Sequence, residues 1–165
     1  MSIAATVTHE ASAPDGDGET AIGREPAPLD EVALTFTRPL IGIERSLHYA
    51  VRPLGLSWEP YSALVSLDEP RLAFMVVPPA ALFGDYVIEI PDPDVAELDL
   101  INADDAVVFV IVRRRGVPSP VANLVAPVVV NRRTRLAAQV VLQDSGYGLM
   151  VPVDAGTARP TSVRS

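Results

Sequence analysis

The sequence predicts a mainly β protein, a small barrel-like antiparallel β domain with one or two short helices. Short runs rich in β-branched and aromatic residues recur along the chain, with turn residues between them. Apolar residues at helical spacing are scarce, which argues against alternating strands and helices. Hydrophobic residues make up 48% of the 165 residues, enough to fill the core of one domain. A small barrel or sandwich is the architecture that fits.

The expected strands are the β-rich runs themselves, each bounded by Gly, Pro, Asp or Asn. They cover residues 31–37, 47–51, 61–67, 72–77, 86–90, 106–112, 121–124, 127–131 and 136–143. The polar stretch NRRTR separates the last two runs. Val121 to Leu149 is therefore predicted to contain two strands joined by a polar turn.

One short helix is expected over residues 92–100, the segment DPDVAELDL. Asp92 is placed to cap it and Pro93 to occupy its first turn. Val95, Leu98 and Leu100 would then face the core. So short a helix is a connector between strands.

The two ends of the chain differ in composition from its body. Residues 1–29 are rich in Ala, Pro, Gly, Asp and Glu and lack hydrophobic periodicity, so we expect a disordered N-terminal arm. Residues 154–165 predict a disordered C-terminal tail. The β domain is expected to span residues 30–153.

Charge is unevenly distributed along the chain. The formal net charge is −8, and residues 1–31 hold seven acids against one arginine. Residues 85–105 carry eight acids and no base, whereas residues 106–143 carry six arginines and no acid. Such separation can steer a charged partner, and the candidates for steering are Glu97, Asp99, Arg132 and Arg133.

The sequence contains few residues that could support catalysis or bind a metal ion. There is no cysteine or lysine, and the only histidines are His9 and His48. A metal site would need more nitrogen or sulfur ligands, and no nucleophile-elbow motif GxSxG is present. We expect a protein without cofactor or enzymatic activity, with His48 as a half-buried strand residue.

No leader or membrane segment is apparent. The first twenty residues lack a basic region followed by an apolar one, and no apolar run approaches the roughly 20 residues that cross a bilayer. With no cysteine, the chain suits a reducing compartment. The expectation is a soluble cytoplasmic protein without a membrane partner.

Two arginine runs, 113–115 and 132–135, allow two interpretations. Asp104, Asp105 and the first arginine run flank the apolar run 106–112, where charges protect against aggregation. The alternative is contact with phosphate groups of RNA. The acidic pI of 4.6 and the lack of aromatic residues in the neighbouring sequence favour protection.

Three amide side chains interrupt apolar runs. Asn123 and Asn131 lie at expected strand ends, and Gln139 lies within AAQVVL. Asparagine is depleted in strands, so each amide is expected to bond with neighbouring backbone. Contact with a partner is the other possible use.

From Ala63 onward, the order of motifs resembles the FliW family of flagellar assembly factors. The matching features include ALVSLDEPRLAFMVV, the pair Asp85 and Tyr86, the pattern NLxAPxxxN from Asn123 to Asn131, and QVVL followed by Tyr147. The upstream segment LTFTRPLIGIE resembles the family less closely. There Pro39, Ile41 and Ile43 depart from its pattern, as do Val65, Ala137 and Ala138 farther on.

The resemblance implies a non-enzymatic cytoplasmic protein with a barrel-like core that binds newly made flagellin. It also implies binding to the translational repressor CsrA, in competition with flagellin, and no direct nucleic-acid partner. The motif positions expected to bind these partners are Asp68, Pro70, Phe74, Tyr86, Asn123, Leu124, Pro127, Asn131 and Gln139.

Two other functions remain open at this point. The departures at Pro39, Ile43 and Val65 are compatible with a generic β-barrel adaptor that has lost the flagellar partners. The arginine runs are compatible with an RNA-binding regulator, whose binding would weaken steeply with salt.

Overall fold

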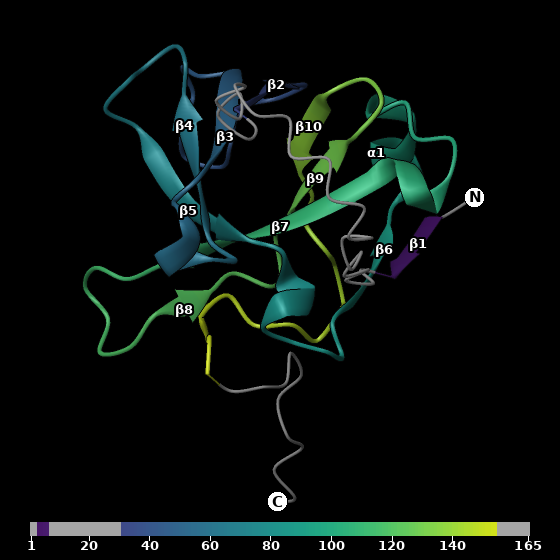
Figure 1. The fold of residues 1–165 in the computed structure, drawn as a ribbon. Helices are drawn as coiled ribbons and strands as arrows, with labels where there is room; N and C mark the ends of the chain where they lie inside the picture. Colours follow the sequence, from purple (N-terminus) through teal and green to yellow (C-terminus); the bar gives the residue numbers. More distant parts are fainter. Residues whose placement is uncertain (1–2, 7–30, 155–165) are drawn as a thin grey trace, which may run out of the picture.

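Seven strands close into a barrel in the computed structural model, which describes residues 3–6 and 31–154 (Figure 1). They are β2 (Val32–Phe36), β3 (His48–Pro53), β4 (Ser62–Ser66), β5 (Ala73–Val77), β7 (Ala106–Arg113), β9 (Val128–Asn131) and β10 (Leu136–Gln139). Around the barrel the order is β7, β5, β4, β3, β2, β10 and β9, and β9 pairs again with β7. The predicted fold class is confirmed.

One pair in this barrel is parallel. β10 and β2 run in the same direction, with Leu136 opposite Thr35 and Ala137 opposite Phe36, whereas the other neighbours are antiparallel. A closed ring with an odd number of strands cannot alternate direction throughout, so at least one pair must be parallel. The sequence runs gave no sign of it, because parallel pairing depends on the order of strands around the ring.

β8 (Val121–Ala122) and β9 follow one another along the same edge of β7. The backbone N–H of Asn123 still bonds the carbonyl of Ile111 at 2.9 Å before the chain breaks away. β11 (Val151–Pro152) pairs with β8. All nine predicted runs therefore contain a strand, and the polar turn at residues 132–135 joins β9 to β10 as predicted.

A separate two-stranded sheet lies beside the barrel, near α1 (Figure 1). In it β1 (Ile3–Thr6) runs antiparallel to β6 (Val87–Ile90). β1 belongs to the arm that was expected to be disordered, so that prediction is wrong for these four residues. Strand pairing with a segment far away in sequence supplies the hydrogen bonds that local composition does not indicate. The rest of the arm and residues 155–165 lie outside the described residues.

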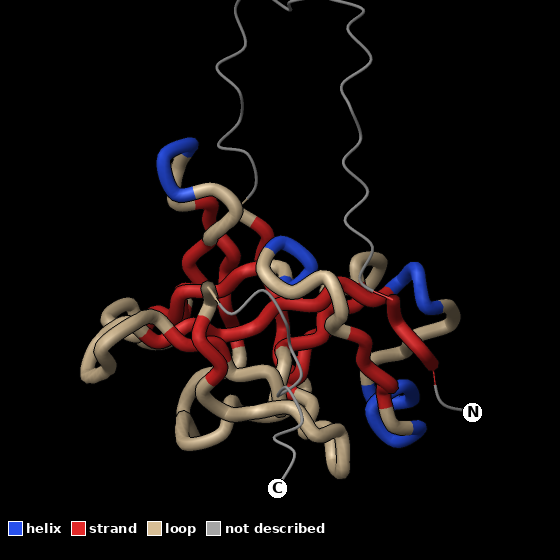
Figure 2. Tube along the Cα trace, turned by 90° about the horizontal axis from the view of Figure 1, so that it is seen from below, coloured by secondary structure: helices blue, strands red, loops and turns tan. Residues whose placement is uncertain are grey.

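Helical structure in the described residues is limited to short connectors, drawn in blue in Figure 2. α1 (Asp92–Glu97) confirms the predicted helix, and the three 3₁₀ turns are η1 (Leu56–Trp58), η2 (Pro79–Ala81) and η3 (Ala103–Asp105). The cap position of α1 is Pro91, one residue before the predicted Asp92. Leu98 and Leu100 are both buried, as predicted. No helix among the described residues is long and apolar enough to cross a membrane.

Two apolar clusters explain why the central strands are hydrophobic without alternation. The barrel interior is filled by Leu34, Phe36, Leu40, Tyr49, Val51, Leu64, Val76, Val128, Val130 and Ala137. The second cluster lies where β6 and α1 cover β7, β9 and β10, and it includes Val108, Val110 and Val129. β7 and β9 thus bury both faces, and doubly buried strands are continuous apolar runs.

His48 does not follow the predicted half-buried pattern. It opens β3 with an exposed side chain, while the next three residues are buried. Its ring faces the carboxylate of Asp68 instead of the core.

We expect Phe36→Ala to destabilise the fold strongly. Phe36 is 1% exposed and its ring lies 4.8 Å from that of Tyr49, centroid to centroid. Truncating a buried phenylalanine costs about 3–5 kcal/mol of unfolding free energy. Thr35→Ala, one residue away and exposed, should change it by less than about 0.5 kcal/mol. Denaturant unfolding measures both, and equal effects would contradict the inward orientation of Phe36.

Candidate functional site

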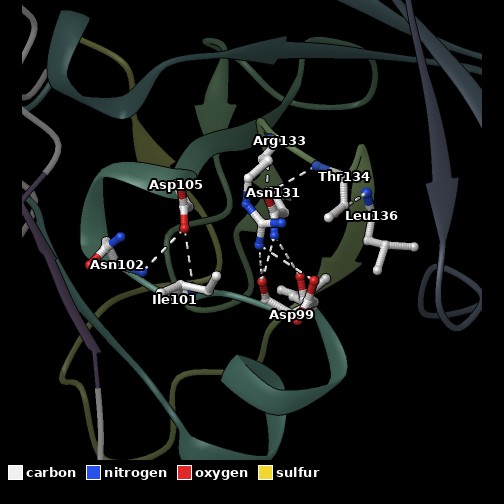
Figure 3. Close-up of polar contacts among 9 residues, drawn as sticks. Asp99, Ile101, Asn102, Asp105, Asn131, Arg133, Thr134 and Leu136 are labelled. Atoms are coloured by element: carbon white, nitrogen blue, oxygen red, sulfur yellow. Dashed lines mark hydrogen bonds and ion pairs between the residues drawn. The ribbon is translucent and has the colours of Figure 1, made fainter.

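Asn131 ties the turn between β9 and β10 to the end of α1 (Figure 3). Its buried amide donates to the carbonyls of Leu98 and Asp99, both at 2.9 Å. Its Oδ1 accepts from the backbone N–H groups of Arg133 at 2.9 Å and Thr134 at 3.2 Å. Bonding to neighbouring backbone is as predicted, and the same amide also reaches backbone more than thirty residues away.

The acidic strip, residues 85–105, is partly neutralised around this network. Arg133 donates to the carbonyl of Asp99 at 3.0 Å and lies 3.4 Å from its carboxylate (Figure 3). Asp105 accepts from the backbone N–H groups of Ile101 and Asn102, both at 3.2 Å. Asp99 and Arg133 are thus paired with each other, which reduces the charge that either offers a partner.

Gln139 and Asn123 also use their amides on backbone. Gln139 Oε1 accepts from the N–H of Ile41 at 3.0 Å, and its Nε2 donates to the carbonyl of Ala126 at 3.2 Å. Asn123 Oδ1 accepts from the N–H of Ala126 at 3.1 Å, closing the turn that separates β8 from β9. Leu124 fills the core inside that turn.

Tyr86 and Tyr147 form a second polar tie inside the apolar layer. The Tyr86 hydroxyl donates to the carbonyl of Leu124 at 2.9 Å, and its burial raises the pKa of that phenol well above the ordinary value. The Tyr147 ring is tilted against that of Tyr86, with centroids 4.7 Å apart. Its hydroxyl accepts from the Val87 N–H at 3.0 Å and donates to the Val87 carbonyl at 2.7 Å.

Asp68 organises the start of β3. Its Oδ2 accepts from the backbone N–H groups of His48 and Leu47, both at 2.9 Å. These two bonds, the His48 bond foremost, lower the pKa of the Asp68 carboxyl to about 2. The carboxylate therefore acts as an anchor for backbone.

The nine motif positions expected to bind partners differ in exposure. Tyr86, Leu124, Pro127, Asn131 and Gln139 are buried, Phe74 and Asn123 are half-buried, and Asp68 and Pro70 are exposed. Burial gives the first group a structural role, and of its members only Gln139 also lines the groove described next. Their contact with a partner stays a prediction.

An open groove of about 910 Å³ lies between β6, the start of α1 and the chain that follows β10. Its lining residues are Arg38, Pro39, Ile41, Val87, Ile88, Glu89, Pro91, Pro93, Asp94, Gln139, Val141, Leu142, Gln143, Asp144, Ser145 and Tyr147. Ile41 is 67% exposed, and Val87 and Val141 are each 46% exposed. Exposed apolar side chains gathered in a concave surface are typical of a binding site.

The positive charge at this groove is already paired. Arg38 donates to the carboxylates of Asp94 and Glu97, both at 2.6 Å, and to the Gln139 carbonyl at 2.9 Å. Glu89 and Asp144 make no ion pair within the described residues. The groove thus combines apolar walls with an acidic rim.

Of the residues that the sequence predicted for partner contact or steering, Gln139 lines the groove, and Glu97 is linked to it only through its ion pair with Arg38. The walls of the groove come from three segments, residues 38–41, 87–94 and 139–147. No local pattern joins them. Val87 and Val141 could have indicated the groove, because each lies between two buried neighbours in sequence. In an extended chain, an apolar residue at such a position faces outward.

The arginine run 113–115 has an aromatic neighbour that its own sequence lacks. The Arg114 guanidinium lies 5.2 Å from the centroid of the Trp58 ring, and Arg113 contacts the sulfur of Met150 at 3.7 Å. The first contact is a cation–π interaction and the second a weak hydrogen bond to sulfur. In the described residues, no group of His, Asp or Glu side chains is placed to hold a metal ion.

Asn131→Ala should cost about 1–3 kcal/mol of unfolding free energy, because buried backbone groups lose their partners. Arg132→Ala, at the exposed turn beside it, should change stability by less than about 0.5 kcal/mol. Chemical denaturation of the two variants makes the comparison. An Asn131→Ala protein of unchanged stability that fails to bind a partner would instead identify Asn131 as a contact residue.

Asp68 should make stability depend on acid pH. Its carboxyl pKa is depressed in the folded state, so its contribution is fully present above the ordinary value of 3.8 and is lost as pH falls through about 2. The melting temperature of Asp68→Asn should therefore fall less steeply than that of the unaltered protein across this window. Parallel slopes for the two proteins would show that the two backbone bonds do not stabilise the fold.

Comparison with known proteins matches this fold and these motifs to one family. The family described as FliW protein matches residues 19–153. The flagellar assembly factor FliW of Bacillus licheniformis is 33% identical over 137 residues, covering 82% of this chain and 91% of that protein. FliW of Bacillus subtilis is 31% identical, covering 75% and 87%.

A solved structure agrees. A crystal structure of the flagellar assembly factor FliW superposes with a TM-score of 0.66 at 26% identity, covering 79% of this chain and 88% of that one. The resemblance predicted from Ala63 to Tyr147 is confirmed and extends upstream over β2 and β3. The chain belongs to the FliW family of flagellar assembly factors.

Proposed function

We propose that this protein is a non-enzymatic binding protein of the cytoplasm that holds flagellin and, in competition with it, the translational repressor CsrA. Membership of a flagellar assembly factor family supports the flagellar role. The observation that carries the binding role is the open groove with exposed Ile41, Val87 and Val141. Apolar residues surrounded by a polar rim are the composition of protein-binding surfaces.

Competition requires only that the two partners cannot occupy the protein together. Flagellin that fills the groove lowers the amount of free protein, so CsrA is released to repress flagellin translation. When flagellin is exported, the free protein binds CsrA again. The regulation is then a matter of concentrations and affinities, and it needs neither a cofactor nor a chemical step.

The acidic strip supports a basic partner for one of the two complexes. Residues 85–105 carry eight acids, and Glu89 lies on the groove itself. An RNA-binding protein such as CsrA presents basic surface, which this strip would attract over a distance of about 10 Å at ordinary salt. Association with CsrA should therefore slow as salt is raised, more than association with flagellin.

RNA binding by this protein itself is less well supported. Arg114 lies on Trp58 and Arg113 on Met150, so both are engaged within the protein. The net charge of −8 also opposes a polyanion. The generic adaptor remains the alternative if the flagellar partners do not bind.

The direct test is titration calorimetry of the full chain with flagellin and CsrA from the same genome. Each should bind alone, and adding flagellin should displace CsrA. A ternary complex would contradict competition. If neither protein binds, the proposed function is wrong, and a pull-down from a motile lysate would then look for the adaptor's partner.

Ile41→Glu should weaken binding of flagellin, CsrA or both by at least about tenfold, because it places an unpaired charge in an apolar wall. Leu149→Glu is the matched control, since Leu149 is 61% exposed and outside the groove lining. Circular dichroism should show both variants folded. Equal loss of binding in the two variants would place the site elsewhere.

A further inference from the structure

One long wall of the groove is strand β6, and the other is the chain after β10, which keeps backbone bonds on one side as far as Leu142 and turns at Gln143 and Asp144. On the latter wall, the N–H groups of Val140 and Leu142 bond the carbonyls of Pro127 and Val125. Backbone groups of alternate residues in an extended chain point to opposite sides, so the N–H groups of Val141 and Gln143 point away from β9. Within the described residues, neither makes a hydrogen bond.

The other wall is β6, whose outer edge pairs with β1. Both backbone groups of Val87 are bonded to the Tyr147 hydroxyl, on the edge opposite β1. Glu89 lies two residues on, so its N–H and carbonyl point to the same side as those of Val87. Among the described residues, no side chain bonds them as Tyr147 bonds Val87.

The stretch of backbone without hydrogen-bond partners has a defined length, because side chains bond the backbone at both of its ends. At one end, the Tyr147 hydroxyl bonds the N–H and carbonyl of Val87. At the other end, Arg38 donates to the carbonyl of Gln139. Glu89 lies between these two bonded positions on one wall, and the backbone from Val141 to Gln143 lies between them on the other. This length admits a few residues of extended chain.

The side chains around this stretch specify the chemistry of an occupant. Val87, Ile41 and Val141 offer apolar contacts. Within the described residues, the groove acids Glu89 and Asp144 make no ion pair, whereas Arg38 is neutralised by Asp94 and Glu97. Complementarity therefore favours an apolar segment that carries a basic side chain.

We propose that the groove binds an extended, apolar and basic segment of a protein partner by strand addition, with the segment pairing to the open backbone at Val141–Gln143 or Glu89. Main-chain hydrogen bonds supply affinity in this mode, and side-chain pockets supply selectivity. The inference rests on the proposed function for its partners, flagellin and CsrA, and names how one of them is held. The segment would lie in one of these two proteins.

Amide hydrogen exchange of the full chain, with and without intact flagellin or CsrA, tests this mode of binding. The partner that occupies the groove should slow exchange by at least about tenfold at Val141 and Gln143, or at Glu89. Ala103, an exposed residue outside the groove lining, serves as the reference amide. A partner that binds without slowing any of the three amides overturns strand addition while leaving the proposed function intact.

Two variants separate backbone pairing from side-chain contact. Val141→Ala keeps the N–H and shortens the side chain, whereas Val141→Pro also removes the donor. Affinity for the partner should fall at least about tenfold further in Val141→Pro than in Val141→Ala. Equal affinities of the two variants for the partner would mean that the partner contacts the Val141 side chain and not its N–H, which overturns the proposal.

A misfolded Val141→Pro variant would not affect the exchange experiment, which uses the unaltered sequence. Overlapping short synthetic peptides covering flagellin and CsrA locate the segment. A peptide rich in apolar residues with at least one arginine or lysine should compete with the intact partner. Competition only by acidic peptides would contradict the charge complementarity at Glu89 and Asp144.

Discussion

Closure of an odd number of strands is the constraint on which the rest of this molecule depends. Seven strands in a ring force one parallel pair, and here it falls between β2 and β10. That pair covers only two residues of each strand before β2 ends at Phe36. Beyond Gln139, the chain after β10 continues in the same direction, and no described strand pairs with it on the β2 side. The groove lies along this unpaired edge.

The same closure explains the need for a second layer. β7 pairs with β5, β8 and β9, and it is apolar on both faces. One face fills the barrel and the other must be covered, which β6, α1 and the chain around Leu124 accomplish. Because these covering segments are short, side-chain amides fix them: Asn131 holds the end of α1, and Gln139 holds the chain after Leu124 at Ala126. The groove lies where this second layer meets the barrel.

The strands were predictable from sequence because their apolar runs are short and clearly bounded by turns. Val107 to Val112 and Val128 to Val130 are continuous apolar runs, as doubly buried strands require. The helix was predictable from Asp92 and Pro93 at its start. Local sequence could also indicate that Asn131 bonds backbone, because the turn residues Arg133 and Thr134 follow it directly.

What sequence could not predict depends on contacts between distant segments. β1 is a four-residue strand whose partner, β6, lies about eighty residues away, and its own composition does not distinguish it from the arm around it. The reach of Asn131 to Leu98 and the meeting of Arg38 with Asp94 are likewise tertiary. The groove needed three such segments at once, so none of its exposed apolar residues was identified beforehand.

The departures from the family pattern acquire different meanings once they are located. Ile43 packs against the barrel interior, and Val65 is half-buried on β4, so their identities are constrained by packing. Pro39 and Ile41 instead line the groove, and Ile41 is largely exposed. A substitution at a buried position is balanced by its neighbours within the same chain, whereas in the proposed function one on the groove would be balanced by the partner. In that proposal, Pro39 and Ile41 are the departures that would alter partner preference.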